Sequence, residues 1–260
     1  MTASLGMAVW SLGRRDVVRF VRQRSRIVGA LGTPMVFWLL IGSGFGSSVR
    51  VSPGDASGHF LEFAFPGTLA LITLFTAIFS TISVIEDRQA GFLQGVLVAP
   101  VGRSAIVWGK LLGSTTLAVA QGMVFLVFAP WSGIELSVGA VARTALSMTV
   151  LGVGLSGLGF LLAWSLDSTQ GFHAIMNLLL MPMWMLSGAL FPAEGAANWV
   201  RWIIAINPMT YGVAAIRESL MGEVGRGAAA GPGFAVSLGV CALFAAVMVV
   251  WSLRMVRRST

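Results

Sequence analysis

Long apolar runs alternate with short polar segments along this chain. Six of the runs approach the roughly 20 apolar residues that a membrane-spanning helix needs. The expected spans cover residues 27–45, 63–85, 111–131, 144–166, 172–191 and 234–253. The pattern predicts an all-α membrane protein, with residues 1–260 forming a single transmembrane domain of six spans.

The segment before the first span, residues 7–26, has the period of an amphipathic helix. Its expected apolar face consists of Trp10, Val17, Phe20 and Val21, and its expected basic face of Arg15, Arg19, Arg22 and Arg26. A basic amphipathic helix next to a span is typical of a helix lying on the cytoplasmic membrane surface. The alternative is a disordered basic tail.

A second amphipathic segment, residues 86–104, joins the second and third spans. Glu86 and Arg88 interrupt the apolar run, and Pro100 with Gly102 ends the helix. Its apolar residues, at i, i+1, i+4 and i+5, are Phe92, Leu93, Val96 and Leu97. We expect a short helix suited to contacting a partner at the membrane surface.

Residues 193–233, between the fifth and sixth spans, contain an interrupted apolar stretch. Trp202–Ile216 is apolar, but its fifteen residues are broken at Asn207-Pro208, so it is too short to cross about 30 Å of hydrocarbon. We expect two short re-entrant helices that enter the membrane from outside and are covered by protein.

Composition and charge support a membrane location. The chain is 56% hydrophobic and 10% charged, whereas soluble domains carry roughly 25% charged residues. The net charge of +7 could indicate nucleic-acid binding, but the basic residues gather at the ends of apolar runs, as membrane orientation requires. Six spans with both termini cytoplasmic place twelve of the seventeen Lys and Arg residues inside. Lys110, at the expected start of the third span, should snorkel to the interface.

Two blocks of residues carry a family resemblance. The first is Glu86-x4-Gly91-x-Leu93-x3-Leu97-Val98-x-Pro100-Val101-x-Arg103, followed by Gly109-Lys110. The second is Leu186-Ser187-Gly188-x2-Phe191-Pro192, followed by Asn207-Pro208-Met209-Thr210-Tyr211 and Arg217. In these blocks the chain resembles the membrane subunit of type-2 ABC transporters, the permeases of daunorubicin-resistance, nodulation-factor and polysaccharide exporters. It departs from the family where Phe92 and Gln94 replace a threonine and an acidic residue.

The resemblance implies that residues 86–104 form a coupling helix, which docks in a groove of a cytoplasmic ATPase subunit. The residues implied in this contact are Glu86, Arg88, Gly91, Phe92, Leu93, Val96, Leu97, Pro100 and Arg103. The alternative is an ordinary connector in the headgroup region of the membrane.

The resemblance also implies an exporter in the bacterial inner membrane, built from two copies of this chain and two ATPase subunits. The translocation path would be lined by spans two and five, with the candidates Phe75, Phe79, Met176, Met181, Met183 and Trp184. An uncharged lining suits a lipidic, amphipathic or glycan-type substrate; the alternative is that these residues face lipid or the core. The candidates for an external gate are Asn207, Pro208, Thr210 and Tyr211.

ATP hydrolysis is not expected in this chain. A phosphate-binding loop has the pattern G-x4-G-K-[ST], but Lys110 is followed by Leu111, and position 104 is serine. ATP and magnesium would therefore belong to the partner subunit, and no cofactor or metal is expected here.

Two other function classes fit the sequence less well. Gly154-Leu155-Ser156-Gly157 matches the G-x-S-G of rhomboid intramembrane proteases, but His59 and His173 are not expected within reach of Ser156; helix packing is the simpler interpretation. A secondary transporter would usually carry carboxylates inside its spans, whereas every Asp and Glu here lies at or beyond an expected span end.

Overall fold

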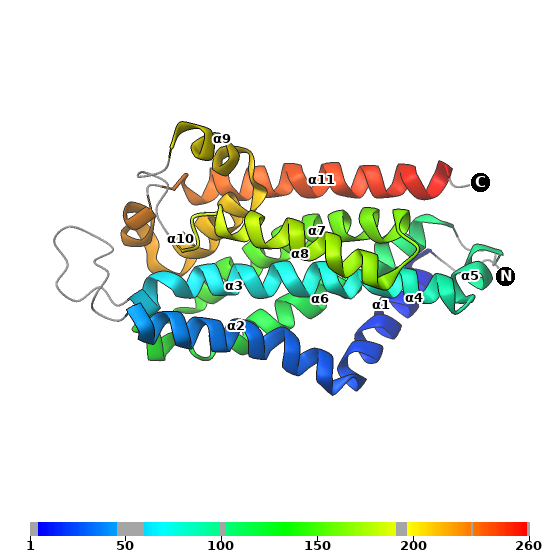
Figure 1. Ribbon diagram of the computed structural model, residues 1–260, viewed down its shortest axis with the longest axis horizontal. Coiled ribbons are helices and arrows are strands. Elements are labelled where there is room, and N and C mark those ends of the chain that lie inside the picture. Colours follow the sequence, from blue (N-terminus) through cyan, green and yellow to red (C-terminus); the bar gives the residue numbers. More distant parts are fainter. Residues whose placement is uncertain (1–4, 46–59, 99–101, 191–196, 230, 259–260) are drawn as a thin grey trace.

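The chain folds into an elongated helical bundle (Figure 1). The structure is a computed structural model that describes residues 5–45, 60–98, 102–190, 197–229 and 231–258, and within these ranges it contains no strand. The helices are α1 Leu5–Arg22, α2 Arg24–Phe45, α3 Phe60–Phe79, α4 Ser83–Gln89, α5 Phe92–Val98, α6 Ser104–Leu126, α7 Val138–Ser165, α8 Thr169–Met185, α9 Asn198–Ile206, α10 Pro208–Ala229 and α11 Phe234–Arg258. Two short 3₁₀ turns, η1 Ser80–Ile82 and η2 Ala129–Ser132, follow α3 and α6.

Three helical segments are long and apolar enough to cross a membrane. They are Phe60–Gln89, which joins α3, η1 and α4, then Val138–Ser165 and Phe234–Arg258. The other three expected spans overlap α2, α6 and α8. The all-helical membrane fold is confirmed, and the count of six spans stays a prediction.

The third expected span starts earlier than the sequence pattern indicated. Helix α6 begins at Ser104 rather than at residue 111 and ends at Leu126. Lys110 was placed at the boundary because it is charged, but it lies in the second turn of the helix and is buried.

Helix α3 forms the centre of the bundle. Most of its side chains are buried, and α2, α6, α7 and α10 pack around it. An apolar helix surrounded on all sides needs no polar face, which explains its almost uniform hydrophobicity.

Helix α7 packs against α11 through the two glycines of the G-x-S-G motif. A Cβ on Gly154 would lie 2.5 Å from the Phe244 ring, and one on Gly157 would lie 2.7 Å from Cβ of Met248. Ser156 is buried, and its Oγ lies 3.4 Å from the Thr115 hydroxyl. His173 is exposed and lies against Phe79, whereas His59 lies outside the described residues. The serine motif therefore serves helix packing.

The two ends of the bundle differ in character. The start of α1 and the end of α11 lie at the end of the bundle that carries α4 and α5, and α9 and α10 lie at the opposite end (Figure 1). The stretch expected to be re-entrant, residues 193–233, contains a helix pair broken at Asn207, and α10 is itself interrupted at Gly222, whose φ of 61° and ψ of −145° are not helical.

Candidate functional site

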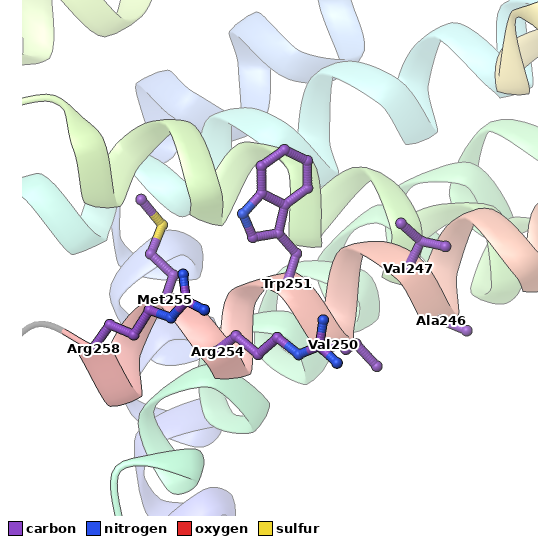
Figure 2. A pocket seen from close by; sticks show the side chains of 7 residues that line it. All are labelled: Ala246, Val247, Val250, Trp251, Arg254, Met255 and Arg258. Atoms are coloured by element: carbon purple, nitrogen blue, oxygen red, sulfur yellow. The ribbon is translucent and has the colours of Figure 1, made fainter.

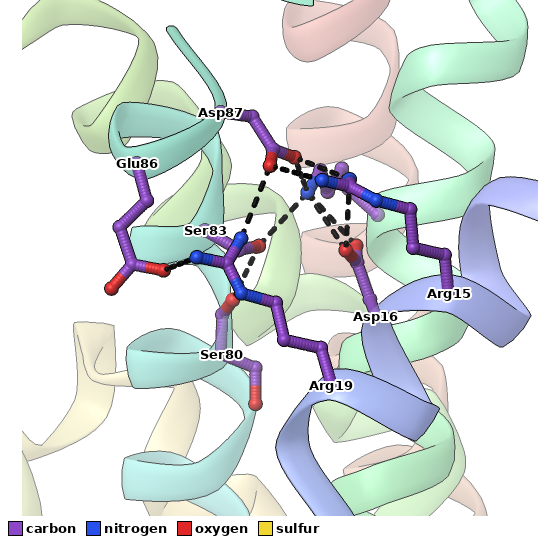
Figure 3. Close-up of polar contacts among 8 residues, drawn as sticks. Arg15, Asp16, Arg19, Ser80, Ser83, Glu86 and Asp87 are labelled. Atoms are coloured by element: carbon purple, nitrogen blue, oxygen red, sulfur yellow. Dashed lines mark hydrogen bonds and ion pairs between the residues drawn. The ribbon is translucent and has the colours of Figure 1, made fainter. Parts of the chain in front are cut away.

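A buried lysine organises the end of the bundle at which α1, α4 and α6 meet. Only 3% of Lys110 is exposed. Its Nζ lies 2.7 Å from Oδ2 of Asp87, 2.9 Å from Oδ2 of Asp16 and 2.9 Å from the hydroxyl of Ser83 (Figure 3). Since an isolated buried ammonium is very costly, these three partners account for its presence.

Two arginines of α1 complete the arrangement. Arg15 donates two hydrogen bonds to the Asp87 carboxylate, of 2.8 and 3.0 Å. Arg19 pairs with Asp87 at 3.1 Å and with Glu86 at 2.9 Å. The ionic cluster thus contains three cations and three carboxylates, namely Arg15, Asp16, Arg19, Glu86, Asp87 and Lys110. Because the charges balance and are mutually hydrogen-bonded, the cluster is compatible with burial.

The pKa values of the α1 groups reflect this environment. Burial raises the pKa of Asp16, and the Lys110 ammonium, which favours the carboxylate, offsets this only in part. Hydrogen bonds to Asp87 raise the pKa of Arg15, so this guanidinium stays charged.

The cluster corrects two expectations. Lys110 does not snorkel, because two carboxylates neutralise it within the protein. The expected basic face of α1 is also wrong in part, because Arg15 and Arg19 turn inward to carboxylates of α4. Of the expected apolar face, Phe20 is buried, whereas Trp10 and Val21 are exposed. The polar side of α1 faces the bundle because the carboxylates of α4 lie there.

Glycines let α1 approach α6 closely. A Cβ on Gly109 would lie 2.8 Å from Cβ of Leu12, and one on Gly113 would lie 3.2 Å from the Gly13 carbonyl oxygen. Only a residue without a side chain allows this separation of the backbones.

We expect Gly109→Ala to destabilise the α1–α6 contact by about 1–3 kcal/mol, as overpacking does. The measurement is the melting midpoint in detergent together with amide-exchange protection of residues 5–22. The control is Gly239→Ala in α11, where a Cβ would meet nothing within 4 Å; alanine should be neutral or better there. Equal behaviour of the two variants would contradict the close contact.

The cluster also positions the expected coupling helix. The chain turns between α4 and α5 at Gly91, whose φ of +74° favours glycine. The guanidinium of Arg15 then lies 3.6 Å from the centre of the Phe92 ring. One arginine of α1 therefore contacts both α4 and α5.

Helix α5 does not present its apolar residues as the sequence suggested. Leu93 is buried in the core and Val96 is half-buried against it. The exposed positions are Phe92, Gln94, Gly95 and Val98, with Val98 86% exposed. Any partner would contact the face formed by these exposed residues, because the face that carries Leu93 and Val96 already packs within the chain.

The other expected coupling residues lie at the borders of this element. Arg88 pairs with Asp167 at 2.9 Å and donates to the Trp164 carbonyl oxygen at 2.7 Å, which ties α4 to the α7–α8 turn. Arg103 directly precedes α6. The Leu97 side chain and Pro100 lie outside the described residues.

Four of the six expected path residues surround one cavity. Phe75, Phe79, Met181 and Trp184 line a space of about 320 Å³ that is also bordered by Pro34 and Phe37 of α2. Two do not line it: Met176 is buried in the core and Met183 is half-buried against it. Among the described residues, no Asp, Glu, Lys or Arg borders this cavity, but His173 and the hydroxyl-bearing Thr33 and Thr76 do.

The expected gate residues hold the corner between α9 and α10. The Asn207 side chain donates to the carbonyl oxygens of Met183 and Leu186, at the end of α8. Thr210 and Tyr211 donate to carbonyl oxygens of the last turn of α9, at 2.7 and 2.9 Å. Pro208 begins α10. The corner is therefore linked to the helix that borders the cavity.

The sequence interpretation did not identify Asp16, Ser83 or Asp87 as partners of Lys110. One signal was available: Lys110 has apolar residues on both sides, Ile106 and Val107 before it and Leu111 after it, with glycines at positions 109 and 113. A lysine in such a run needs a buried carboxylate, but the sequence does not show which one.

Comparison with known proteins shows which family this chain resembles. The family model described as ABC-2 type transporter matches residues 7–221. The putative transport permease ycf38 of Cyanophora paradoxa is 26% identical over 209 residues, which are 79% of this chain and 71% of the relative. Nodulation protein J of Rhizobium leguminosarum bv. viciae is 25% identical over 84% of this chain and 82% of its own length.

A third relative matches a smaller part. The probable multidrug ABC transporter permease YbhR of Escherichia coli is 30% identical over 151 residues, which are 57% of this chain and 41% of the relative. The family match spans the ionic cluster, α5 and the α9–α10 corner. The chain is integral to the membrane and belongs to the ABC-2 type transporter family, as an ABC transporter membrane subunit.

Proposed function

We propose that this chain is the permease subunit of an ABC exporter, in which α5 transmits the motion of a separate cytoplasmic ATPase to the spans. The observation that carries the proposal is the contact of Arg15 with both Asp87 and Phe92. It fixes α5 to α1 and α4, so a force applied to α5 would reach α3 and α6 through the ionic cluster.

The proposed topology has six spans with both termini in the cytoplasm. Helices α2 and α6, with 22 and 23 residues, reach about 33 and 35 Å at 1.5 Å per residue, enough to cross about 30 Å of hydrocarbon. Helix α8 is shorter, with 17 residues. To cross the same thickness of hydrocarbon, it would need the non-helical residues that follow it. The start of α1 and the end of α11 lie at the same end of the bundle as α5, which supports this orientation.

Two copies of the chain and two ATPase subunits would form the complete transporter. The outward face of α8 supports a partner copy, because Ile175, Leu178 and Met185 are exposed on it. The path would lie where the α2–α3–α8 cavity meets its counterpart. Its mainly apolar lining, with His173 and two threonines as polar groups, suits an amphipathic, lipidic or glycan-linked substrate better than an ion.

The cavity assignment predicts the behaviour of Phe75→Ala/Phe79→Ala. In the reconstituted complex, half-maximal stimulation of ATPase activity by an amphipathic substrate should need at least tenfold more substrate, about 1.4 kcal/mol, while basal activity is retained. A panel of amphipathic dyes and lipid-linked sugars serves as the probe. The control is Leu243→Ala, on the exposed face of α11 and away from the cavity. An unchanged response of the double variant would refute the cavity as the substrate path.

A further inference from the structure

The outward face of α11 changes from apolar to cationic near its C-terminal end. This helix is the least enclosed of the three long apolar segments, with 22% of its apolar window buried. Its inward residues include Ala245, Val249 and Ser252. The opposite face carries Val247, Val250, Trp251, Arg254 and Arg258, all exposed.

These five residues border an open groove of about 740 Å³ together with Ala246 and Met255 (Figure 2). The order along the groove is two valines, then tryptophan, then two arginines one helical turn apart. Figure 2 shows the Arg254 side chain running back along the helix toward Val250. Its guanidinium therefore lies beside the apolar part of the groove.

The two arginines differ from those of the ionic cluster in having no partner carboxylate. Within the described residues, neither Arg254 nor Arg258 makes an ion pair or a side-chain hydrogen bond, whereas Arg15 and Arg19 do. Like charges four residues apart on a helix repel each other. An anion between the two guanidinium groups would remove this repulsion and could accept bidentate hydrogen bonds.

We propose that this groove binds an anionic phospholipid of the cytoplasmic leaflet. The phosphate lies between Arg254 and Arg258, Trp251 lies at the level of the glycerol backbone, and an acyl chain follows Val250 and Val247 toward the membrane centre. Charge complementarity and the apolar-to-cationic order identify this occupant, since tryptophan and arginine mark the interface of anionic leaflets. The assignment of the leaflet rests on the proposed orientation of the exporter.

The experiment uses the full chain in vesicles of phosphatidylcholine containing one tenth phosphatidylglycerol. A trace of photoactivatable phosphatidylglycerol is crosslinked, and the labelled peptides are mapped by mass spectrometry. A matched phosphatidylcholine probe measures ordinary lipid contact. We expect labelling of residues 247–258 to favour phosphatidylglycerol by about 30-fold, which is about 2 kcal/mol at 1.4 kcal/mol per tenfold.

The Arg254→Gln/Arg258→Gln variant should lose this preference, and Arg257→Gln, one residue away, should keep most of it. Equal labelling by both probes, or an unchanged preference in the double variant, would overturn the lipid site. Loss of labelling when the ATPase subunit binds would also overturn it, because the groove would then be a protein contact. The labelling needs no ATPase, so the lipid site can still be tested if the exporter assignment fails. Preferential labelling by a probe confined to the outer leaflet would refute the proposed orientation.

Discussion

Replacing Lys110 with methionine should release α1 from the bundle. Methionine keeps the length of the side chain but leaves Asp16 and Asp87 without the ammonium that lies within 3 Å of both. Breaking a buried ion pair in this way costs about 3–5 kcal/mol, which corresponds to a melting midpoint lower by on the order of 10 °C for a chain of this size. Scanning fluorimetry in detergent measures the shift.

Amide exchange separates release of α1 from general unfolding. Residues 5–22 should lose protection in Lys110→Met, while α7 and α11 keep theirs. The matched control is Asp167→Asn, which removes the Arg88 ion pair at a carboxylate that is 93% exposed; such pairs contribute at most about 1 kcal/mol. A Lys110→Met protein that melts like the control would show that the cluster does not hold α1.

The members of the cluster should differ in importance. Asp87 accepts hydrogen bonds from Lys110, Arg15 and Arg19. In the described part of the chain, Asp16 accepts them from Lys110 alone, and its contact with Arg15 is a longer ion pair of 4.0 Å. Burial also raises the pKa of Asp16. A neutral asparagine at this position should therefore lower the stability of the fold less than one at Asp87 does. In the same measurement, Asp16→Asn should therefore be milder than Asp87→Asn.

The second large effect is expected on the exposed face of α5. The Gly95→Asp/Val98→Asp variant should lower affinity for the ATPase subunit by about 30-fold or more, as loss of an interface hot spot of about 2 kcal/mol does. A Cβ on Gly95 would meet nothing within 4 Å, and Val98 is exposed, so the fold should survive. Affinity is measured by titrating the purified ATPase subunit against the reconstituted chain.

Val138→Asp is the control for this surface variant. Val138 is exposed to a similar extent and begins α7 at the opposite end of the bundle from α5. It carries the same chemical change but should bind the ATPase normally. If Gly95→Asp/Val98→Asp and Val138→Asp bind equally well, α5 is not the docking element.

The sequence allowed the helical membrane class, the position of α5 and the break at Asn207 to be predicted, because each depends on local signals. Runs of apolar residues, a glycine with positive φ and an Asn-Pro pair act within a few residues of themselves. Four of the six path candidates also meet at one cavity, since helical spacing places Phe75 and Phe79 on the same side of α3.

The orientation of α1 and the role of Lys110 could not be predicted in this way. Both depend on Asp16 and Asp87, which lie 94 and 23 residues from Lys110 in the chain. The amphipathic pattern of α1 predicts a basic face turned to water, but two of its arginines, Arg15 and Arg19, face the carboxylates of α4. Likewise, Leu93 seemed available to a partner because the pattern of α5 does not reveal that its apolar face packs within the chain.

Docking of an ATPase subunit through α5 is central to the proposed function, and co-purification tests it directly. The tagged chain is extracted from its native membrane in gentle detergent, and the recovered proteins are identified by mass spectrometry. We expect stoichiometric recovery of a protein with a phosphate-binding loop, and its loss with Gly95→Asp/Val98→Asp. Repeated recovery of the chain alone, or equal recovery of the ATPase with the variant, would contradict the account.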